Sequence, residues 1–415
     1  MMSIAPIRST APQRVSSMVL LTGLIAGRFD LARFSPTLAV LDIRMVFAIA
    51  ACLATLLLST TRPTVRRSVP SRFLLLLSLW FAWLLLGAAW APTGARLDEY
   101  VADIGYLAVF LLCTLVTLVH FDSRDWLFLW KVILVIAVVY FLGAVAAGPG
   151  DQGRYSAFGG GPNVFVRIMG LGAIAALLIH LRTLNVLVLG LLPIFAAGAV
   201  LSGSRGGLVA AASIAVIAVP ALFKRLGWRR SFGFSVLVLG GGVISFIAFG
   251  SALTRVFEQR VVLLTLVDGY SSGRSEIVAA ALDLFRQHPF IGVGLDGYYG
   301  LVGQYAGLEY PHNLFLAAAA EGGLIGLVLL LLPLTFVATC LLRGRPLTAV
   351  TLCAWLASLF MLVSSMFSGD YYDSRFIWFF AIAALSSASA AAGSPERGRA
   401  KLNNSAKSLP RITPL

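Results

Sequence analysis

Pro311, His312 and Asn313 mark the point where a polar segment, about residues 254–311, gives way to a long apolar run. Histidine exchanges a proton near neutral pH, so His312 is a candidate general base. Pro311 disfavours helical backbone in the residue before it, which predicts a helix that begins just afterwards with Asn313 suited to its N-cap. The simpler alternative is that His312 is an interfacial side chain beside that cap.

Glu321 lies nine positions after His312 in the predicted helix. At about 100° per residue, this separation places the two side chains on nearly opposite faces. We therefore predict a structural role for Glu321, as a hydrogen-bond partner of a neighbouring helix, rather than a pair with His312.

Four arginines, Arg154, Arg205, Arg274 and Arg375, stand in or beside short glycine- or serine-rich segments. Arg205 belongs to Ser-Gly-Ser-Arg-Gly-Gly at 202–207, which predicts a tight hairpin whose glycines expose backbone N–H groups. Arg274 opens an amphipathic helix, where a cation opposes the helix dipole unless a bound anion shares that end. Both positions are therefore candidate anion sites.

Each of these two arginines also has a plainer interpretation. Arg205 could be a side chain that snorkels from an ordinary helix turn. Arg274 could form an exposed ion pair with Glu276 or Asp283, which would contribute little energy. Helical spacing of apolar residues and a suitable N-cap, Ser272, predict that the helix after Arg274 lies on the outer membrane face.

The elements that must position these residues follow from composition, because 59% of the 415 residues are hydrophobic and 12% are charged. This apolar content exceeds the ~45–50% of soluble domains. Blocks near the ~20 residues needed to cross a bilayer predict an all-α polytopic membrane protein with about 12 transmembrane helices. The blocks lie near 15–27, 45–60, 73–90, 101–119, 126–147, 164–179, 184–201, 206–223, 232–249, 314–342, 347–367 and 376–391.

We predict one membrane domain over residues 1–392, with one long extracytoplasmic loop at about 254–311 that contains short amphipathic helices. Lys and Arg gather in connections on one side of this topology, so both termini should be cytoplasmic and residues 393–415 a basic, disordered tail. Anionic lipid explains the net charge of +14. We expect membrane lipids and no nucleic acid among the partners.

We expect no metal and no other cofactor. The four cysteines lie in apolar spans, and the four histidines show no ligand spacing. Gly-Val-Gly-Leu-Asp-Gly at 292–297 matches a dinucleotide fingerprint, but neither a βαβ pattern nor a helix start accompanies it. We interpret this segment as a compact turn.

Three motifs occur in a fixed order: Ser-Arg-Gly-Gly at 204–207, Arg274 near the start of the long loop, and Pro-His-Asn at 311–313 before an alanine-rich helix with Glu-Gly-Gly at 321–323. In this order they resemble the O-antigen ligase and O-antigen polymerase superfamily of bacterial membrane glycosyltransferases. The resemblance covers about residues 154–375. It implies that a glycan on an undecaprenyl diphosphate carrier is transferred to an acceptor hydroxyl, with Arg205 and Arg274 on the diphosphate and His312 activating the acceptor.

The same resemblance relates Arg154 and Asn163 to an earlier Arg to Pro-Asn element of the family. We assign these two residues to substrate binding, together with Asn313 and Arg375. Guanidinium groups bind phosphate oxygens bidentately without a metal, and direct displacement would invert the anomeric centre. The implied place is the outer face of the bacterial cytoplasmic membrane.

The acceptor stays open between a lipid-linked core glycan, a growing polymer and a protein. A ligase or polymerase is favoured because the loop is of moderate length and the chain has no separate soluble domain. A lipid-linked oligosaccharide flippase is the competing class, and Lys131 and Arg167 inside predicted spans keep it open. A non-catalytic envelope assembly protein is the third.

Overall fold

The computed structural model describes residues 11–26, 37, 42–61, 68–150, 153–258, 274–306, 309–343 and 347–392. These residues are helical and contain no β-strand beyond an isolated antiparallel bridge between Pro149 and Tyr155. The all-α prediction is thus confirmed for this part of the chain. The predicted tail at 393–415 and the predicted cap at Ser272 lie outside the described residues.

The helices follow one another along the chain with short connections. They are α1 (Ala11–Ala26), α2 (Ile43–Thr61), α3 (Ser71–Leu86), η3 (Gly87–Trp90), α4 (Leu97–Val119), α5 (Ser123–Ala147), α6 (Gly161–Thr183), η5 (Leu187–Gly190), α7 (Leu191–Leu201), α8 (Arg205–Phe257), α9 (Arg274–Gln287), the π-helical turn η7 (Tyr299–Gly303), α10 (Gln304–Ala306), α11 (Leu314–Leu342), α12 (Ala349–Ser364), η8 (Tyr372–Ser374) and α13 (Arg375–Ala392).

Six helical segments are long and apolar enough to cross a membrane: Ile43–Thr61, Ser71–Trp90, Leu97–Val119, Ser123–Ala147, Gly161–Thr183 and Leu314–Leu342. Shorter apolar helices occupy Leu187–Leu201, Arg205–Pro220, Phe246–Val256 and Ala349–Ser364. Length and composition therefore support six spans, and the larger count of about 12 stays a prediction.

α8 joins two apolar blocks that the sequence separates, 206–223 and 232–249. The backbone of Gly227 leaves helical geometry between them, with φ 74° and ψ 164°. Glycine adopts a positive φ without a Cβ clash, so it permits the change of direction inside the basic segment 224–230.

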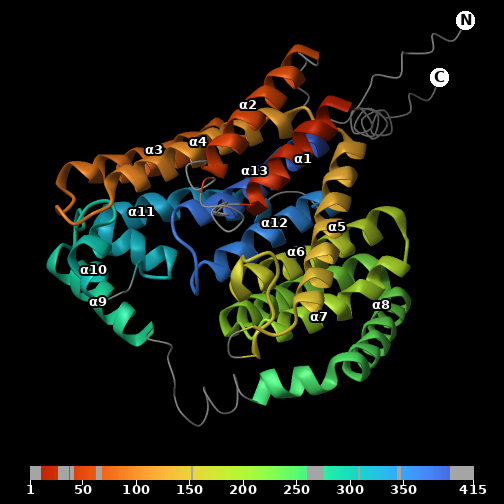
Figure 1. Cartoon of the computed structure of the whole chain (residues 1–415). Coiled ribbons are helices and arrows are strands. Elements are labelled where there is room, and N and C mark those ends of the chain that lie inside the picture. The colour runs from red at the N-terminus through yellow and green to blue at the C-terminus, as the bar shows by residue number, and fades with distance from the viewer. Residues whose placement is uncertain are drawn as a thin grey trace, which may run out of the picture.

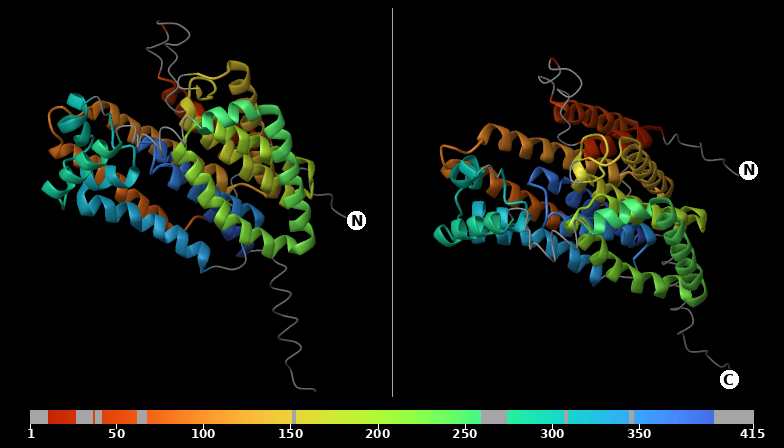
Figure 2. Two further views of the ribbon diagram at one scale, coloured as in Figure 1. Left: turned by 90° about the horizontal axis from the view of Figure 1, so that it is seen from below. Right: turned by 60° about the horizontal axis from the view of Figure 1, so that its bottom comes forward.

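α13 forms the centre of the bundle. It packs against α12, α4 and α11, and the side chains from Phe376 to Leu385 are all buried. The Trp378 ring lies 5.5 Å from that of Trp80 and 6.4 Å from that of Phe73. Figures 1 and 2 show this blue helix enclosed between the orange helices and the green ones. Arg375, at its first turn, therefore lies in the protein interior.

α9 and α10 lie together at one end of the molecule (Figure 1). The apolar side chains of α9, Ile277, Ala281 and Leu284, are buried in a cluster with Tyr298 and with Ala320 of α11. The prediction that this apolar face rests on the membrane is therefore wrong, because protein covers it. A periodic pattern shows which face is buried, but it does not show whether lipid or protein buries it.

α11 is interrupted at Gly323, where φ is 65° and ψ is −162°. The turn at 292–297 packs into this break, and the Gly294 N–H donates to the Glu321 carbonyl at 3.0 Å. A Cβ on Gly323 would stand 2.3 Å from the backbone carbonyl carbon of Phe290. The glycines of the rejected dinucleotide motif thus make a close backbone contact with the Glu-Gly-Gly motif.

Candidate functional site

The turn between α7 and α8 is held by the loop that precedes α6. Arg154 Nε donates to the Ser202 carbonyl at 3.0 Å. The Ser204 hydroxyl donates to Asn163 Oδ1 at 2.8 Å. Two predicted substrate-binding residues, Arg154 and Asn163, therefore lie against the hairpin that presents Arg205, and their hydrogen bonds fix its shape.

Arg205 is the first residue of α8 and is half-buried. Ser204 is the N-cap, and its Oγ accepts from the Gly207 N–H at 3.3 Å, so the cap uses this N–H that we expected to be exposed. A Cβ on Gly206 would stand 2.3 Å from the Cβ of Phe367. The small residues after Arg205 permit close packing, and the positive end of the helix makes the position favourable for an anion.

His312 is half-buried and has a left-handed backbone with φ 52°. Its ring centroid lies 4.1 Å from that of Tyr310. Burial lowers the pKa of His312, the positive charge of Arg274 lowers it further, and Glu309 acts in the opposite direction. The structure thus brings Arg274 and His312 together and favours the neutral imidazole, the form that accepts a proton.

Asn313 is the N-cap of α11, as the plainer interpretation of the sequence predicted. Its Oδ1 accepts from the N–H groups of Phe315 at 2.9 Å and Leu316 at 3.2 Å. The Leu314 N–H donates to the Ser365 carbonyl at 3.1 Å, so the helix start is anchored to the end of α12. This arrangement fixes His312 one residue before the cap.

Glu321 is buried at the break in α11. Its Oε1 accepts from the Tyr298 N–H at 3.4 Å, so its partner lies in the turn before η7 rather than on a neighbouring membrane helix. This is consistent with a structural role, because the bond ties the loop after α9 to the helix that begins next to His312.

Arg96, in the connection between α3 and α4, is a site residue that we did not predict. Its Nε lies 3.1 Å from the buried carboxylate of Asp296, and its guanidinium stands 3.6 Å from the ring centroid of Tyr299. Its Nη2 also donates to the Glu309 carbonyl at 3.3 Å. One arginine therefore holds both the loop after α9 and the segment that leads to His312.

Arg375 does not join the other predicted residues. It is 4% exposed, and it forms an ion pair with Asp373 at 2.8 Å and a hydrogen bond from Nε to the Leu24 carbonyl at 3.0 Å. Arg167 of α6, 5% exposed, binds the other oxygen of the same carboxylate at 3.1 Å and also bonds Ser368. The two arginines thus clamp one aspartate between α6 and α13.

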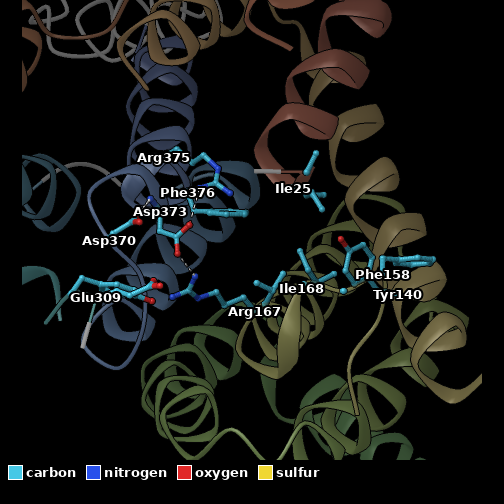
Figure 3. Close-up of a pocket in the computed structure, with 15 residues that line it drawn as sticks. Ile25, Tyr140, Phe158, Arg167, Ile168, Glu309, Asp370, Asp373, Arg375 and Phe376 are labelled. Carbon is cyan, nitrogen blue, oxygen red and sulfur yellow. Dashed lines mark hydrogen bonds and ion pairs between the residues drawn. The ribbon is translucent and has the colours of Figure 1, made fainter. Parts of the chain in front are cut away.

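These ion pairs line a cavity of about 310 Å³. Figure 3 shows the charged groups of Glu309, Asp370, Asp373, Arg167 and Arg375 on one side. On the opposite side lie Ile25, Ile168, Tyr140 and Phe158. The cavity therefore has a polar wall and a largely apolar, aromatic wall.

Tyr310 connects this cavity to His312, because it lines the cavity while its ring contacts the imidazole. The pKa of Tyr310 is raised to about 12, first by burial and then by the negative charges of Asp373 and Asp370. Its phenol therefore stays protonated at neutral pH and can donate a hydrogen bond.

Arg96, Glu309, Tyr310, Asp370 and Asp373 belong to the site but were not predicted. The available signal was charge, because Asp370 and Asp373 stand in a short polar connection of a chain with few acidic residues. Within the described residues, His, Cys, Asp and Glu side chains form no group of three or more that could hold a metal ion.

Residues 189–331 match the family described as O-antigen ligase. The match contains Arg205, Arg274, His312, Asn313 and Glu321, and it ends before the segment with Asp373 and Arg375. No curated protein matches the chain.

The matched family and the apolar helices together indicate a multi-pass protein of the bacterial inner membrane that acts in glycan transfer. The motifs that first suggested this relationship, Ser-Arg-Gly-Gly and Pro-His-Asn with Glu-Gly-Gly, all fall inside the matched segment. Through residues 189–331, the chain belongs to the O-antigen ligase superfamily.

Proposed function

We propose that this protein transfers a glycan from an undecaprenyl diphosphate carrier to an acceptor hydroxyl at the outer face of the cytoplasmic membrane. The observation that carries the proposal is the position of His312. It lies beside Arg274 at the start of α11, inside the segment that matches the O-antigen ligase family, and its pKa is lowered.

His312 is the base in this proposal. The acceptor hydroxyl oxygen attacks the anomeric carbon of the donor sugar, and the hydroxyl proton passes to the neutral imidazole of His312. The bond between the anomeric carbon and the phosphate oxygen breaks, and its electron pair stays on the diphosphate. A direct displacement of this kind inverts the anomeric centre.

Arg205 and Arg274 stabilise the leaving group. Negative charge grows on the diphosphate oxygens as the bond breaks, and guanidinium groups bind such oxygens bidentately. Both arginines begin helices, α8 and α9, whose N-terminal N–H groups favour the same anion. With this charge supplied by the protein, we expect transfer to continue when a chelator removes divalent cations.

His312→Ala tests the base directly in the purified protein. Loss of a general base lowers kcat by about 100- to 10,000-fold. Binding of the carrier-linked donor should change little, because the phosphate contacts are elsewhere. His288→Ala is the control, since His288 is an exposed histidine of the same loop region. Transfer at the normal rate by His312→Ala would overturn the assignment of the base.

Deletion in the host distinguishes the transferase types and the competing classes. Full-length polymer that remains on the carrier indicates a ligase, and single repeat units indicate a polymerase. Unchanged pools of carrier-linked and surface glycan would contradict a transferase. Carrier-linked glycan trapped on the cytoplasmic side would instead indicate a flippase.

A further inference from the structure

We propose that the cavity between α6, α13 and the segment before His312 binds a sugar ring of a glycan substrate, with Asp373 as its central hydrogen-bond acceptor. This inference rests on the proposed function, because it names the part of the substrate that this cavity takes. Neither the family match nor the predicted diphosphate residues account for the cavity.

The two walls of the cavity suit a sugar. Its polar wall carries carboxylate and guanidinium groups, which accept from and donate to hydroxyls. Its other wall includes Tyr140 and Phe158, whose rings lie 5.0 Å apart in an edge arrangement. A sugar ring has hydroxyls at its edge and C–H groups on its faces, so it matches both walls. The volume of about 310 Å³ fits a small ligand rather than a long glycan chain.

The charge of the cavity argues against a diphosphate. Two guanidinium groups and three carboxylates line it, which leaves one excess negative charge when all are ionised. A diphosphate would meet repulsion there, whereas Arg205 and Arg274 offer positive helix ends. We therefore assign the diphosphate to those two arginines and the neutral, hydroxyl-rich part of a substrate to the cavity.

The polar wall is fixed before any ligand arrives. Asp373 is held by Arg167 at 3.1 Å and by Arg375 at 2.8 Å, and its backbone N–H donates to Asp370 at 2.9 Å. Arg375 is 4% exposed, and its Nη2 has no hydrogen-bond partner among the described residues. A buried donor without a partner is costly, so a ligand oxygen at this position would be favourable.

Phe158 is the clearest sign of a ligand on the apolar wall. Its side chain is 51% exposed, although an aromatic ring usually packs away from water, and its backbone has a φ of 51°. A bulky residue in the left-handed region is strained, and such strain is concentrated at functional positions.

The cavity lies between the base and the hairpin. Tyr310 lines it and contacts His312, with ring centroids 4.1 Å apart. On the other side, Arg167 bonds Ser368, whose neighbour Phe367 packs on Gly206 beside Arg205. A ring bound here would be adjacent to both groups that the proposed reaction needs.

Phe158→Ala is the first test, because an exposed side chain can be removed without unfolding the protein. Full-length wild-type and variant proteins are purified, and initial rates are measured with the host's carrier-linked glycan and its acceptor glycolipid varied in turn. We expect KM for one of the two to rise about ten-fold, a loss typical of one aromatic contact, with kcat nearly constant. Phe290→Ala, which removes another exposed phenylalanine (68%) outside the cavity, is the matched control.

The substrate whose KM rises identifies the source of the sugar. A rise for the carrier-linked glycan places the donor ring in the cavity, and a rise for the glycolipid places the acceptor ring there. Asp373→Asn keeps the shape of the side chain and should raise KM for the same substrate, with folding followed by thermal unfolding in detergent. Unchanged KM values for both substrates in folded Phe158→Ala and Asp373→Asn would overturn the proposal.

A binding measurement separates this inference from the proposed function. The glycan released from the host's carrier is added to the protein without carrier, and contact is detected by saturation-transfer NMR. Signal with wild type that falls in Phe158→Ala supports the cavity even if no transfer is observed, in which case the proposed function alone fails. No signal with wild type under conditions where transfer occurs counts against the cavity.

Discussion

Two oppositely charged neighbours set the proton affinity of His312. Arg274 lowers its pKa and Glu309 raises it, while burial lowers it further. Arg274 therefore has two consequences in the proposed reaction, since it binds the leaving group and also keeps the imidazole in its basic form. Its removal should change both the height and the pH dependence of the rate.

The pH profile of transfer tests this arrangement. The neutral imidazole is the active form, so the rate should rise with pH through a pKa below 6.5 and then level off. Arg274→Gln removes a charge that lowers the pKa, so the rising limb should move to higher pH. Glu309→Gln removes a charge that raises the pKa, so the limb should move to lower pH.

Initial rates from about pH 4.5 to pH 8 give the position of the limb independently of the maximal rate. The wild-type profile is the reference, and His288→Ala should reproduce it. Movement of the limb in the same direction in Arg274→Gln and Glu309→Gln would contradict an electrostatic origin.

Single residues were predictable where their partners are close in the sequence. Asn313 as N-cap is an example, because the cap bonds the two residues that follow. The environment of Arg375 was not predictable, since Asp373 also binds Arg167, which lies 206 positions away in the chain. The sequence shows that such a charge exists inside an apolar chain, but only the packing of α6 on the segment before α13 shows what neutralises it.

At the scale of elements, α11 illustrates what hydropathy does not report. The apolar block 314–342 predicted one continuous helix, and glycines inside an apolar helix do not by themselves end it. The interruption at Gly323 depends on the loop after α9, which supplies hydrogen bonds to the opened turn. The predicted turn at 292–297 and the Glu-Gly-Gly motif are two halves of one contact.

Gly323→Ala should therefore be strongly destabilising. The φ of 65° with ψ of −162° is accessible essentially to glycine alone, and a Cβ would stand 2.3 Å from the Phe290 backbone. We expect a loss of about 3 kcal/mol or more, seen as a lower midpoint of thermal unfolding in detergent. Gly105→Ala in α4 is the control, because a Cβ there has no neighbour within 4 Å. A wild-type midpoint for Gly323→Ala would contradict the importance of the break.

At the scale of the whole molecule, the sequence predicted the class of fold, and the described helices confirm it. Orientation in the membrane rests on charge. The basic connections lie on one side of the predicted topology, and the positive-inside rule places that side in the cytoplasm. The site residues of α8, α9 and α11 should then face outward.

Cysteine labelling in cells tests this orientation. Glu276→Cys, exposed on α9, should react with a membrane-impermeant maleimide in intact spheroplasts. Leu187→Cys, at a position 81% exposed in the connection between α6 and α7, should react only after permeabilisation. Wild type is the background control, since its four cysteines lie in apolar helices. The reverse pattern would place the site on the cytoplasmic face.

The central position of α13 has a consequence for synthesis. A ribosome makes this helix after α1 to α12, yet its side chains from Phe376 to Leu385 are enclosed by those helices. The nascent bundle must therefore stay open along this path until the last helix enters the membrane. Asp373 and Arg375 arrive with it, so the hairpin and His312 are translated before the sugar cavity can close. Transfer competence and completion of the fold then coincide in the final step of translation.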